Sequence, residues 1–560
     1  MLKGHPKGLI VASLANMGER FGYYTMIAIF LLFLQAKYGL DSTAATQIFG
    51  IFLAAVYFMP LFGGIIADRL LGYGKTVSIG LIIMFLGYVI LAIPTSRNSG
   101  LWTIIAALTV ISLGTGLFKG NLQALVGNMY DDPRYSGNRD VAFNIFYMCI
   151  NVGAMFAPTA AEAVSNFMLQ KSGFFYNASI PALAHKYLNG DMSVATQLSG
   201  LAQAQHADPS NLAGFCDNYI TALSGAYHWA FAVACISLIV SMAIFWGFRK
   251  YYKGADMSEK EKAKSADYKN TVVELTPEQT RQRMIALGLV FFVVIFFWMS
   301  FHQNGAAMTM FARDYTVDKV SKFTNIWFDL FALLSVFFAA VGVYFMIKKS
   351  SNTKTRLFGL AGLIVFALIA YYRISFYSDV NPVTPQKFQQ FNPFFIVSLT
   401  PIIVGLFSWL KTKGIEPSAP RKIGMGMVIT CVGFTILALG SLSLIGLSPK
   451  EIHEVRAPVD SLISPYWLIS TYFILTIAEL FLSPMGISFV SRVAPPKYKG
   501  FMMGGWFAAT AIGNYGVALV AMTWKHLPLW LFWMILVTGC MLSAIFIFSL
   551  MKRLEAATKQ

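Results

Sequence analysis

The feature that most limits how this chain can fold is a succession of apolar segments, each about as long as a membrane is thick. Of the 560 residues, 56% are hydrophobic and only 12% are charged, whereas a soluble domain carries about 25% charged residues. A membrane-spanning helix needs about 20 predominantly apolar residues. Fourteen segments meet this requirement: 9–36, 44–67, 76–94, 101–127, 141–166, 226–248, 284–306, 325–347, 357–377, 392–410, 423–446, 464–488, 501–523 and 528–551. The sequence therefore predicts an all-α integral membrane protein with 14 spans.

The distribution of charge predicts how the spans are oriented. A net charge of +17 would suggest nucleic-acid binding in a soluble protein, but the basic residues here form short clusters between apolar segments. Lys and Arg are enriched in cytoplasmic loops. If the N-terminus is cytoplasmic, most of the 43 Lys and Arg fall on the cytoplasmic side. We therefore predict a multi-pass protein of the plasma membrane (the inner membrane in a bacterium), with both termini cytoplasmic, a lipid bilayer around it and no nucleic-acid partner.

Two long polar segments predict the domain organisation. Residues 167–225 form an outer loop, and residues 249–283 form a cytoplasmic linker that contains a solvated run of charges. The linker separates an N-terminal six-helix bundle (1–248) from eight spans (284–560). Removing spans eight and nine, within 324–380, leaves six spans in each half, so we expect an inserted hairpin that packs outside a twelve-span core. Two bundles around a central site are typical of transporters.

Ionisable residues deep within spans are the strongest indication of a functional site. Each costs at least about 2.5–3.5 kcal/mol to insert and usually marks a substrate or ion pathway. Five lie deep within spans: Glu19, Arg20, Lys119, His302 and Glu479. With the histidine neutral their charges sum to zero, so opposite charges could compensate one another in a wet cavity. Structural pairing between helices is the alternative, but four charges on three spans plus a histidine on a fourth favour a binding cavity.

Polar and aromatic side chains share helix faces with these charges. They recur at the i, i+4 spacing that places residues on one face: Asn16, Arg20 and Tyr24; Tyr147 and Asn151; Trp298 and His302; Glu479 and Ser483; Trp506, Thr510 and Asn514. Aromatic residues in spans also serve simply as core or interface residues. Their combination with buried charge predicts a cavity that offers both charge and aromatic surface.

Several motifs resemble those of one transporter family. The segment GGIIADRLLG (63–72) resembles the cytoplasmic loop signature of the major facilitator superfamily, and ERFGYY (19–24) resembles the second part of the ExxERFxYY motif of proton-coupled oligopeptide transporters. Similar motifs follow along the chain: GTGLFKGN (114–121), FYMCINVG (146–153), FW (297–298), QFNP (390–393), AELFLSPMG (478–486) and GGWFAATAIGNY (504–515). The resemblance implies a major facilitator fold of two six-helix bundles plus the inserted hairpin.

The resemblance also implies roles for matching residues. Arg20 and Lys119 would face the carboxylate of a peptide, and Glu479 would face its amino terminus. The pocket would be lined by Tyr23, Tyr24, Tyr57, Asn151, Trp298, Asn392, Trp506 and Thr510. A short peptide is a zwitterion, so a cavity with cations on one side and a carboxylate on the other would orient it. Aromatic faces would accept varied side chains.

Three positions depart from the family pattern. Asn16 stands at the first Glu of ExxER, Ile27 stands at an arginine of the first span, and His302 stands at an acidic residue of the seventh span. The family's arginine and acid are taken to pair with each other, so the loss of both leaves no unpaired charge. Because histidine changes charge near neutral pH, we expect His302 and Glu19 to be the proton-coupling groups.

The sequence therefore predicts a secondary active transporter that takes up di- and tripeptides with protons by alternating access. We expect it to work as a monomer, without a metal, with protons as coupling ion and no other cofactor. The same fold with another anionic or zwitterionic solute, such as nitrate or a peptide-like metabolite, is the alternative, but a simple anion would have no use for Glu479. No HExxH or GxSxG motif supports a membrane-embedded enzyme. A receptor or structural protein that uses the outer loop is a further alternative.

Overall fold

The computed structural model describes residues 4–95, 100–256, 276–348, 351–495 and 499–559. The N-terminal half comprises α1 (Lys7–Tyr38), α2 (Ser42–Phe58), α3 (Pro60–Ile66), the π-helix η1 (Ala67–Leu71), α4 (Tyr73–Ala92), α5 (Trp102–Asn128), η2 (Ser136–Asn138), α6 (Arg139–Lys171), α7 (Ile180–Leu188), η3 (Met192–Val194), α8 (Ala195–Ala204), α9 (Leu212–Gly247), η4 (Arg249–Tyr251) and η5 (Lys253–Ala255).

The C-terminal half comprises α12 (Pro277–Phe301), η6 (His302–Gly305), α13 (Ala307–Asp314), β1 (Lys319–Val320), α14 (Lys322–Phe328), α15 (Leu330–Ile347), α16 (Thr353–Ser375), β2 (Asn381–Pro382), η7 (Pro385–Gln390), α17 (Phe391–Thr412), α18 (Ala419–Gly440), η8 (Ser441–Leu444), η9 (Val459–Ser461), α19 (Tyr466–Val493), α20 (Lys499–Ala521), α21 (Leu529–Ser549) and α22 (Met551–Lys559). The two short strands pair antiparallel, with Val320 opposite Asn381.

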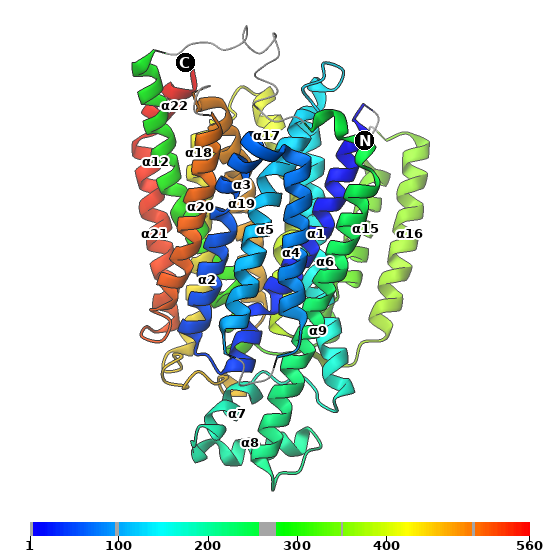
Figure 1. Ribbon diagram of the computed structural model, residues 1–560. Helices are drawn as coiled ribbons and strands as arrows, with labels where there is room; N and C mark the ends of the chain where they lie inside the picture. Colours follow the sequence, from blue (N-terminus) through cyan, green and yellow to red (C-terminus); the bar gives the residue numbers. More distant parts are fainter. Residues whose placement is uncertain (1–3, 96–99, 257–275, 349–350, 496–498, 560) are drawn as a thin grey trace.

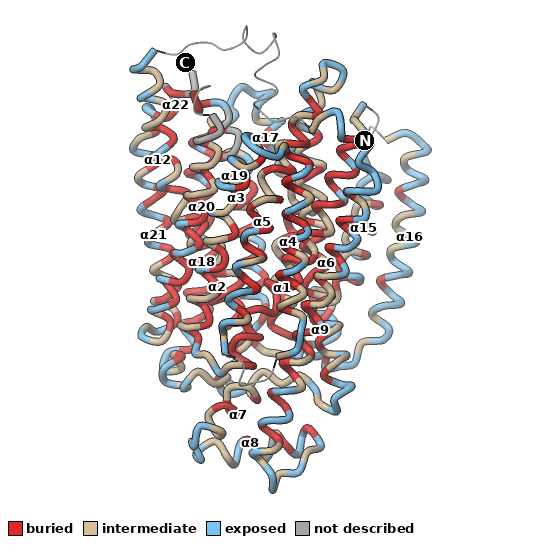
Figure 2. The backbone as a smooth tube through the Cα atoms, in the orientation of Figure 1, coloured by how far each residue is buried: buried red, intermediate tan, exposed pale blue. Residues whose placement is uncertain are grey.

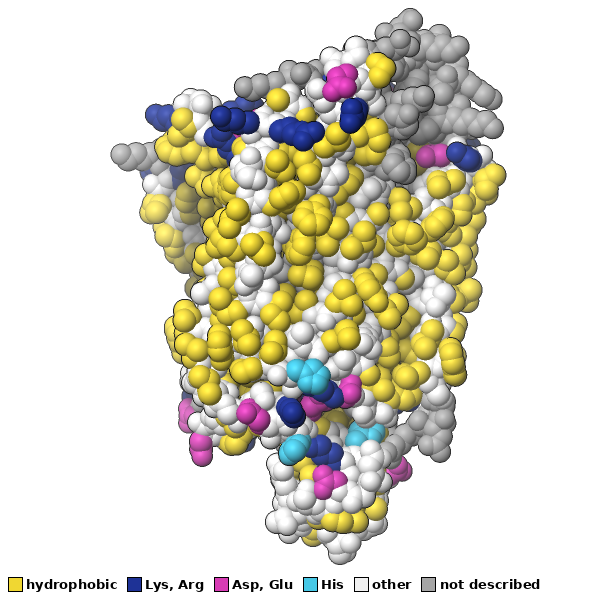
Figure 3. All heavy atoms as spheres, turned by 90° about the vertical axis from the view of Figure 1, so that its left-hand side faces the viewer, with side chains coloured by type: hydrophobic (Ala, Val, Ile, Leu, Met, Phe, Trp, Pro, Cys, Tyr) yellow, Lys and Arg dark blue, Asp and Glu magenta, His cyan; other side chains and the backbone are white. Residues whose placement is uncertain are grey.

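The apolar segments are membrane-spanning helices, as the sequence predicts. Thirteen helices of the described chain are long and apolar enough to cross a membrane, and each coincides with one predicted span. The remaining prediction, 501–523, coincides with α20. Figure 3 shows a broad hydrophobic surface between two ends where charged side chains gather. The all-α, multi-pass membrane fold is therefore confirmed.

Two bundles make up the core. In the N-terminal half α1 packs against α6 and α9, and α4 packs against α5; in the C-terminal half α18 packs against α19 and α21, and α12 packs against α20. Small residues permit the closest of these approaches, because a Cβ added at Gly80 would lie 2.8 Å from the carbonyl oxygen of Gly114. Gly116 permits a similarly close approach, because a Cβ there would lie 2.5 Å from the side chain of Met59. Gly120 is not needed for packing, since a Cβ there meets nothing nearer than 3.9 Å.

The two ends of the molecule differ. Both termini lie at one end, here called the terminal end, and α7 and α8 project from the other, the α7–α8 end (Figure 1). The predicted polar loop 167–225 contains a small helical domain, in which α7 packs against α9 and α1, and α8 packs against α9. Figure 2 shows that part of this domain is buried. The predicted linker 249–283 lies largely outside the described residues.

The inserted hairpin consists of α15 and α16, which stand at the side of the bundles (Figure 1). Asp329 caps α15 by accepting from the backbone N–H of Phe331 at 3.0 Å, and Arg373 of α16 donates to the same carboxylate at 2.7 Å. Along α16 only Gly359 and Ala370 are buried. The short helix α14 differs, because its Phe328 is buried against aromatic rings of the core. The separable segment therefore begins after α14 rather than at 324.

We predict that excision of 331–376, with a short Gly-Ser linker in its place, leaves a folded carrier. Asp329 and Tyr377 are in hydrogen-bond contact at 3.0 Å, so the cut ends already lie close together. The core surface exposed by the cut includes Phe156 and Phe394, which lipid can cover. Excision of 324–380, which removes Phe328, is the matched comparison and should not yield monodisperse protein by size-exclusion chromatography. Equal behaviour of the two excisions would contradict this boundary.

Candidate substrate-binding site

The five deep ionisable residues lie on both bundles. Glu19 and Arg20 belong to α1 and Lys119 belongs to α5, whereas His302 begins η6 at the end of α12 and Glu479 lies in α19. Each bundle thus contributes charge to a central polar cluster, which we define as these five residues. The five side chains have different kinds of interaction partner.

Glu19 and Arg20 neutralise each other. Nε and Nη2 of Arg20 donate to the two carboxylate oxygens of Glu19 at 2.5 and 2.7 Å, and both side chains are buried. The guanidinium also lies 4.8 Å from the centre of the Tyr23 ring. Such bidentate pairs are among the strongest polar contacts in proteins. The pair is therefore internally compensated, and only Nη1 of Arg20 lacks a hydrogen bond in the described structure.

Lys119 has an aromatic partner in place of an anion. Its Nζ lies 3.4 Å from the centre of the Tyr57 ring, which comes from α2. No hydrogen bond or ion pair to Lys119 occurs within the described part of the chain. A cation–π contact is worth about 0.5–2 kcal/mol, less than a buried ion requires. Asn16, where the family pattern has a glutamate, is buried on α1 and is uncharged.

Glu479 is held by neutral donors from both bundles. Asn392 of α17 donates to one carboxylate oxygen at 2.9 Å, and the Tyr147 hydroxyl of α6 donates to the other at 3.3 Å. Asn392 is itself placed by Thr476, which lies 3.1 Å from the same amide nitrogen. The sequence paired Tyr147 with Asn151 by helical spacing but did not assign it to the site, and it gave no signal for Thr476. The carboxylate is oriented without being neutralised.

His302 lies between aromatic rings. It stacks on Trp298 with ring centres 5.0 Å apart, and the Tyr57 ring is 5.9 Å away. Its Nδ1 is buried without a hydrogen-bond partner in the described chain. Lys119 and Asn514 also face the imidazole. The Tyr57 ring is therefore shared by Lys119 on one bundle and His302 on the other.

The remaining predicted pocket residues differ in whether their polar atoms are free or are bonded to the backbone. Tyr23 and Tyr24 form an edge-to-face pair at 5.3 Å, and Asn151 donates to the backbone of Tyr147. Trp506 lies over Gly486, where an added Cβ would collide with the indole. Thr510 donates to the carbonyl of Trp506 at 3.0 Å, so its hydroxyl is turned to the backbone. The ring contacts from Tyr57 through His302 to Trp298 join the two halves of the site.

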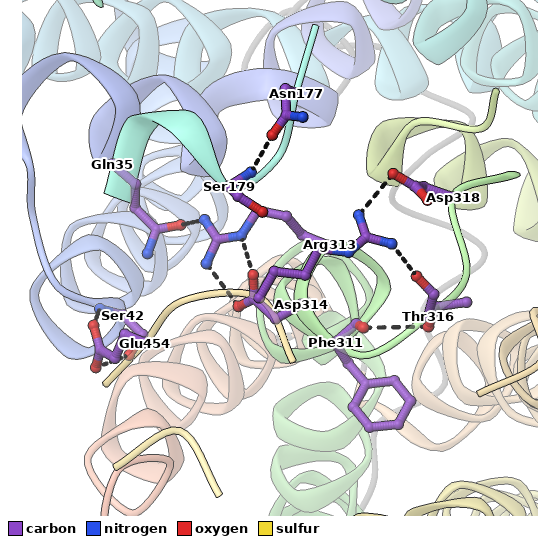
Figure 4. Close-up of polar contacts among 11 residues, drawn as sticks. Gln35, Ser42, Asn177, Ser179, Phe311, Arg313, Asp314, Thr316, Asp318 and Glu454 are labelled. Atoms are coloured by element: carbon purple, nitrogen blue, oxygen red, sulfur yellow. Dashed lines mark hydrogen bonds and ion pairs between the residues drawn. The ribbon is translucent and has the colours of Figure 1, made fainter. Parts of the chain in front are cut away.

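The bundles are tied together at the α7–α8 end. Lys525 of the C-terminal half contacts Asp41 at 2.7 Å and Glu454 at 2.9 Å. Glu454 in turn accepts from Ser42 at the start of α2, and Arg313 donates to Gln35 of α1 at 2.6 Å (Figure 4). Lys387 and Glu162 add a further pair at 3.1 Å. Among the described residues, the ion pairs Lys525–Asp41 and Lys387–Glu162 thus join the bundles at this end.

The loop that presents Glu454 is strained. His453 and Glu454 have φ of 52° and 56°, a conformation that costs a side-chain-bearing residue about 1–2 kcal/mol. The carboxylate reaches the first turn of α2, where a negative charge is favoured by the helix dipole. Burial acts to raise the pKa of Asp41, but hydrogen bonds from Ala44 and Lys525 hold it below its usual range. The tie through Asp41 therefore persists at mildly acidic pH.

Comparisons with known proteins agree with the resemblance in the motifs. The family model described as the POT family matches residues 74–273 and 367–530. The chain is 29% identical over 518 residues to a di-/tripeptide transporter of Lactococcus lactis subsp. cremoris, covering 90% of this chain and 87% of that protein. It is 24% identical over 532 residues to the peptide transporter YePEPT of Yersinia enterocolitica, covering 92% and 88%.

Solved structures share the fold. A peptide transporter POT in complex with sulfate is 22% identical with a TM-score of 0.65, covering 100% of this chain and 97% of that chain. A POT family transporter in complex with 5-aminolevulinic acid is 19% identical with a TM-score of 0.65, covering 99% and 98%. The two-bundle arrangement of this chain is thus that of these structures.

We predict that Lys525→Gln opens the α7–α8 end. The substitution removes the Lys525–Asp41 ion pair, which crosses between the bundles, and the Lys525–Glu454 pair, which positions Glu454 within the C-terminal half. The crossing pair is worth up to about 1 kcal/mol, so its loss should shift the closed-to-open ratio by up to about fivefold. Distances between spin labels at Asn189 and Val459, both exposed and on opposite bundles, report the ratio by pulsed electron paramagnetic resonance. Lys450→Gln, an exposed lysine of the same loop region, is the control. Identical distance distributions for both variants would contradict the tie.

Proposed function

Because the chain belongs to the POT family, we propose that it is a carrier that takes up di- and tripeptides together with protons by alternating access. The observation that carries this proposal is that Lys119 and Glu479, on opposite bundles, lack a neutralising countercharge. A short peptide supplies both missing charges, since its carboxylate matches the lysine and its ammonium matches the glutamate. Relatives named as di-/tripeptide transporters support the same substrate.

The central cluster recognises the two ends of the peptide. The Lys119 ammonium leaves the Tyr57 ring and binds the carboxylate, with Nη1 of Arg20 as a second donor, and Glu479 accepts hydrogen bonds from the amino terminus. Tyr147 and Asn392 hold Glu479 in its rotamer. Tyr23, Tyr24, Asn151, Trp298, Trp506 and Thr510 form the surrounding wall. Nitrate as substrate would leave Glu479 without a role, so this alternative is disfavoured.

Alternating access follows from where the bundles are tied. With both termini in the cytoplasm, the α7–α8 end faces outward and is closed in this structure by Lys525, Glu454 and Arg313. Opening that end breaks these contacts and relieves the strain at His453 and Glu454. Peptide bound between Lys119 and Glu479 draws the bundles together and favours reclosure. One chain supplies the whole central cluster, so we propose that the monomer is the working unit.

Protons are the coupling ion, and no bound cofactor is required. His302 faces Lys119, Tyr57, Trp298 and Asn514, with Glu19 and Arg20 nearby on α1. A proton on His302 repels Lys119 across the shared Tyr57 ring and drives the lysine towards the substrate carboxylate. Glu19 is the second titrating group, and its protonation frees the guanidinium of Arg20.

The proposal is tested by uptake of labelled dialanine into proteoliposomes with an imposed inward proton gradient. We expect the gradient to drive accumulation in the wild type and Lys119→Ala to abolish it. Loss of a charge-assisted hydrogen bond costs about 1.5–3 kcal/mol, or a 10- to 150-fold loss of affinity. Lys75→Ala, an exposed lysine of the same bundle, is the control. Unchanged uptake by Lys119→Ala would overturn the assignment.

The amine site makes a separate prediction. Glu479→Gln keeps the size of the side chain and the hydrogen bonds from Tyr147 and Asn392 in modified form, but it removes the charge. We expect it to weaken binding of dialanine at least tenfold while leaving the weak binding of N-acetyl-dialanine unchanged, as measured by competition against labelled substrate. Equal losses for both peptides would show that Glu479 does not contact the amine.

The role of His302 predicts a change in pH dependence. His302→Gln retains a neutral hydrogen-bonding side chain but cannot be protonated, so it should lose the acid limb of the uptake profile. Counterflow exchange, which needs no net proton movement, should survive. His206→Gln, an exposed histidine of the α7–α8 domain, is the control. A profile equal to that of the wild type, with intact accumulation, would leave Glu19 as the remaining candidate.

A further inference from the structure

A cavity lies at the α7–α8 end, and none of the central cluster's residues line it. Its volume is about 160 Å³. One wall is formed by the end of α1, by α7 and by α9 of the N-terminal half, and the other by Arg313 and the strained loop at His453 and Glu454 of the C-terminal half. Figure 4 shows Arg313, Gln35 and Glu454 at the junction of the two bundles. The cavity is therefore complete only while the two bundles are in contact.

The acidic side chains that line the cavity have hydrogen-bond and ion-pair partners, whereas its basic side chains keep unused hydrogen-bond donors. Asp41 and Glu454 are bound by Lys525, Ser42 and the N-terminus of α2. Arg313 gives three of its five N–H groups to Asp314 and Gln35, so two remain. The Lys186 ammonium has no hydrogen bond or ion pair in the described structure. Unmet hydrogen-bonding capacity in the cavity is thus predominantly that of cationic donors.

The Lys186 ammonium is partly removed from water and forms no ion pair in the described structure. It is half-buried on α7, and burial lowers the pKa of its ammonium against the opposing effect of Asp191 and Glu454. The exposed side chain of His453 adds a third nitrogen-bearing group on the opposite wall. A bound anion would compensate these groups.

The size and the lining of the cavity limit what that anion is. An engineered cavity of about 150 Å³ accommodates benzene, so about 160 Å³ holds a molecule the size of one amino-acid residue. Apolar and aromatic residues form part of the lining, namely Leu32, Leu223, Tyr176 and Tyr227. Inorganic anions would leave these residues without a contact. A carboxylate attached to a small apolar group matches both the donors and the apolar residues.

We propose that this cavity is a binding site for a small carboxylate-bearing solute, which Lys186 and Arg313 hold by its carboxylate. Because both bundles supply walls, the solute binds only the state in which the α7–α8 end is closed, and it stabilises that state by mass action. The solute is either a free monocarboxylate or the carboxyl-terminal residue of a peptide. The site is independent of what the central cluster carries.

The test uses the full-length purified protein carrying Lys119→Ala, so that the central site does not contribute. N-acetylglycine, a monocarboxylate without an amine, is added against sodium chloride at equal ionic strength. At about 100 times its Kd we expect the thermal unfolding midpoint to rise by about 2 °C. The distance between spin labels at Val459 and at Gln197, an exposed residue of α8 outside the cavity lining, should shift towards the closed value. Adding Lys186→Gln should remove both effects, whereas adding Lys171→Gln, an exposed lysine at the same end, should remove neither.

The outcomes separate this site from the central one. Absence of both effects in the Lys119→Ala protein, or their persistence with Lys186→Gln, would overturn the proposal. Glycylglycine in the same background identifies the source of the carboxylate: an equal effect indicates the end of a peptide, and no effect beside a positive N-acetylglycine result indicates a free monocarboxylate. Failure of peptide uptake by the wild type would instead count against the proposed transport function.

Discussion

A charged side chain inside a bilayer is tolerated only where a countercharge or a polar group compensates it. The organisation of this molecule depends on which buried charges have such a partner and which do not. Glu19 and Arg20 are neighbours on α1 and cancel each other through two short hydrogen bonds. Among the described residues, Lys119 and Glu479 have no such partner: the lysine contacts an aromatic ring, and the glutamate accepts from an amide and a hydroxyl. In the function that we propose, a zwitterion supplies both missing charges, which are divided between the two bundles. Substrate recognition would then draw the bundles together.

The second organising feature is the asymmetry between the two ends. On the α7–α8 side, Lys525, Glu454 and Arg313 join the bundles through an ion pair and hydrogen bonds, and part of their stabilisation offsets the left-handed backbone at His453 and Glu454. A tie made of partly exposed polar contacts is weak enough to break during each transport cycle. The small domain of α7 and α8 lies over this junction, where α7 also lines the proposed carboxylate-binding cavity.

Hydropathy predicted the spans closely because a bilayer imposes a length and an apolar composition on every crossing helix. Rare buried charges likewise identified the central residues. The sequence does not specify interaction partners: the resemblance implies that Arg20 and Lys119 face one substrate carboxylate, yet in this structure Nε and Nη2 of Arg20 donate to Glu19. Lys37, near the end of α1, is buried and bound to Thr95 and His228, which the sequence does not predict because burial at a helix end depends on neighbouring helices. The helices of 167–225 were hidden for a related reason, since short polar helices gain their stability from tertiary packing.

The central claim is that two separated and uncompensated charges recognise the two ends of a zwitterion. Equilibrium binding of dialanine, its N-acetyl derivative, its carboxamide and the doubly blocked peptide to the wild-type protein tests it most directly. We expect each single block to weaken binding at least tenfold, in keeping with the loss of one charge-assisted contact, and the double block to abolish it. Similar affinity for all four peptides would contradict the account, because it would mean that neither Lys119 nor Glu479 contacts a charged end of the substrate.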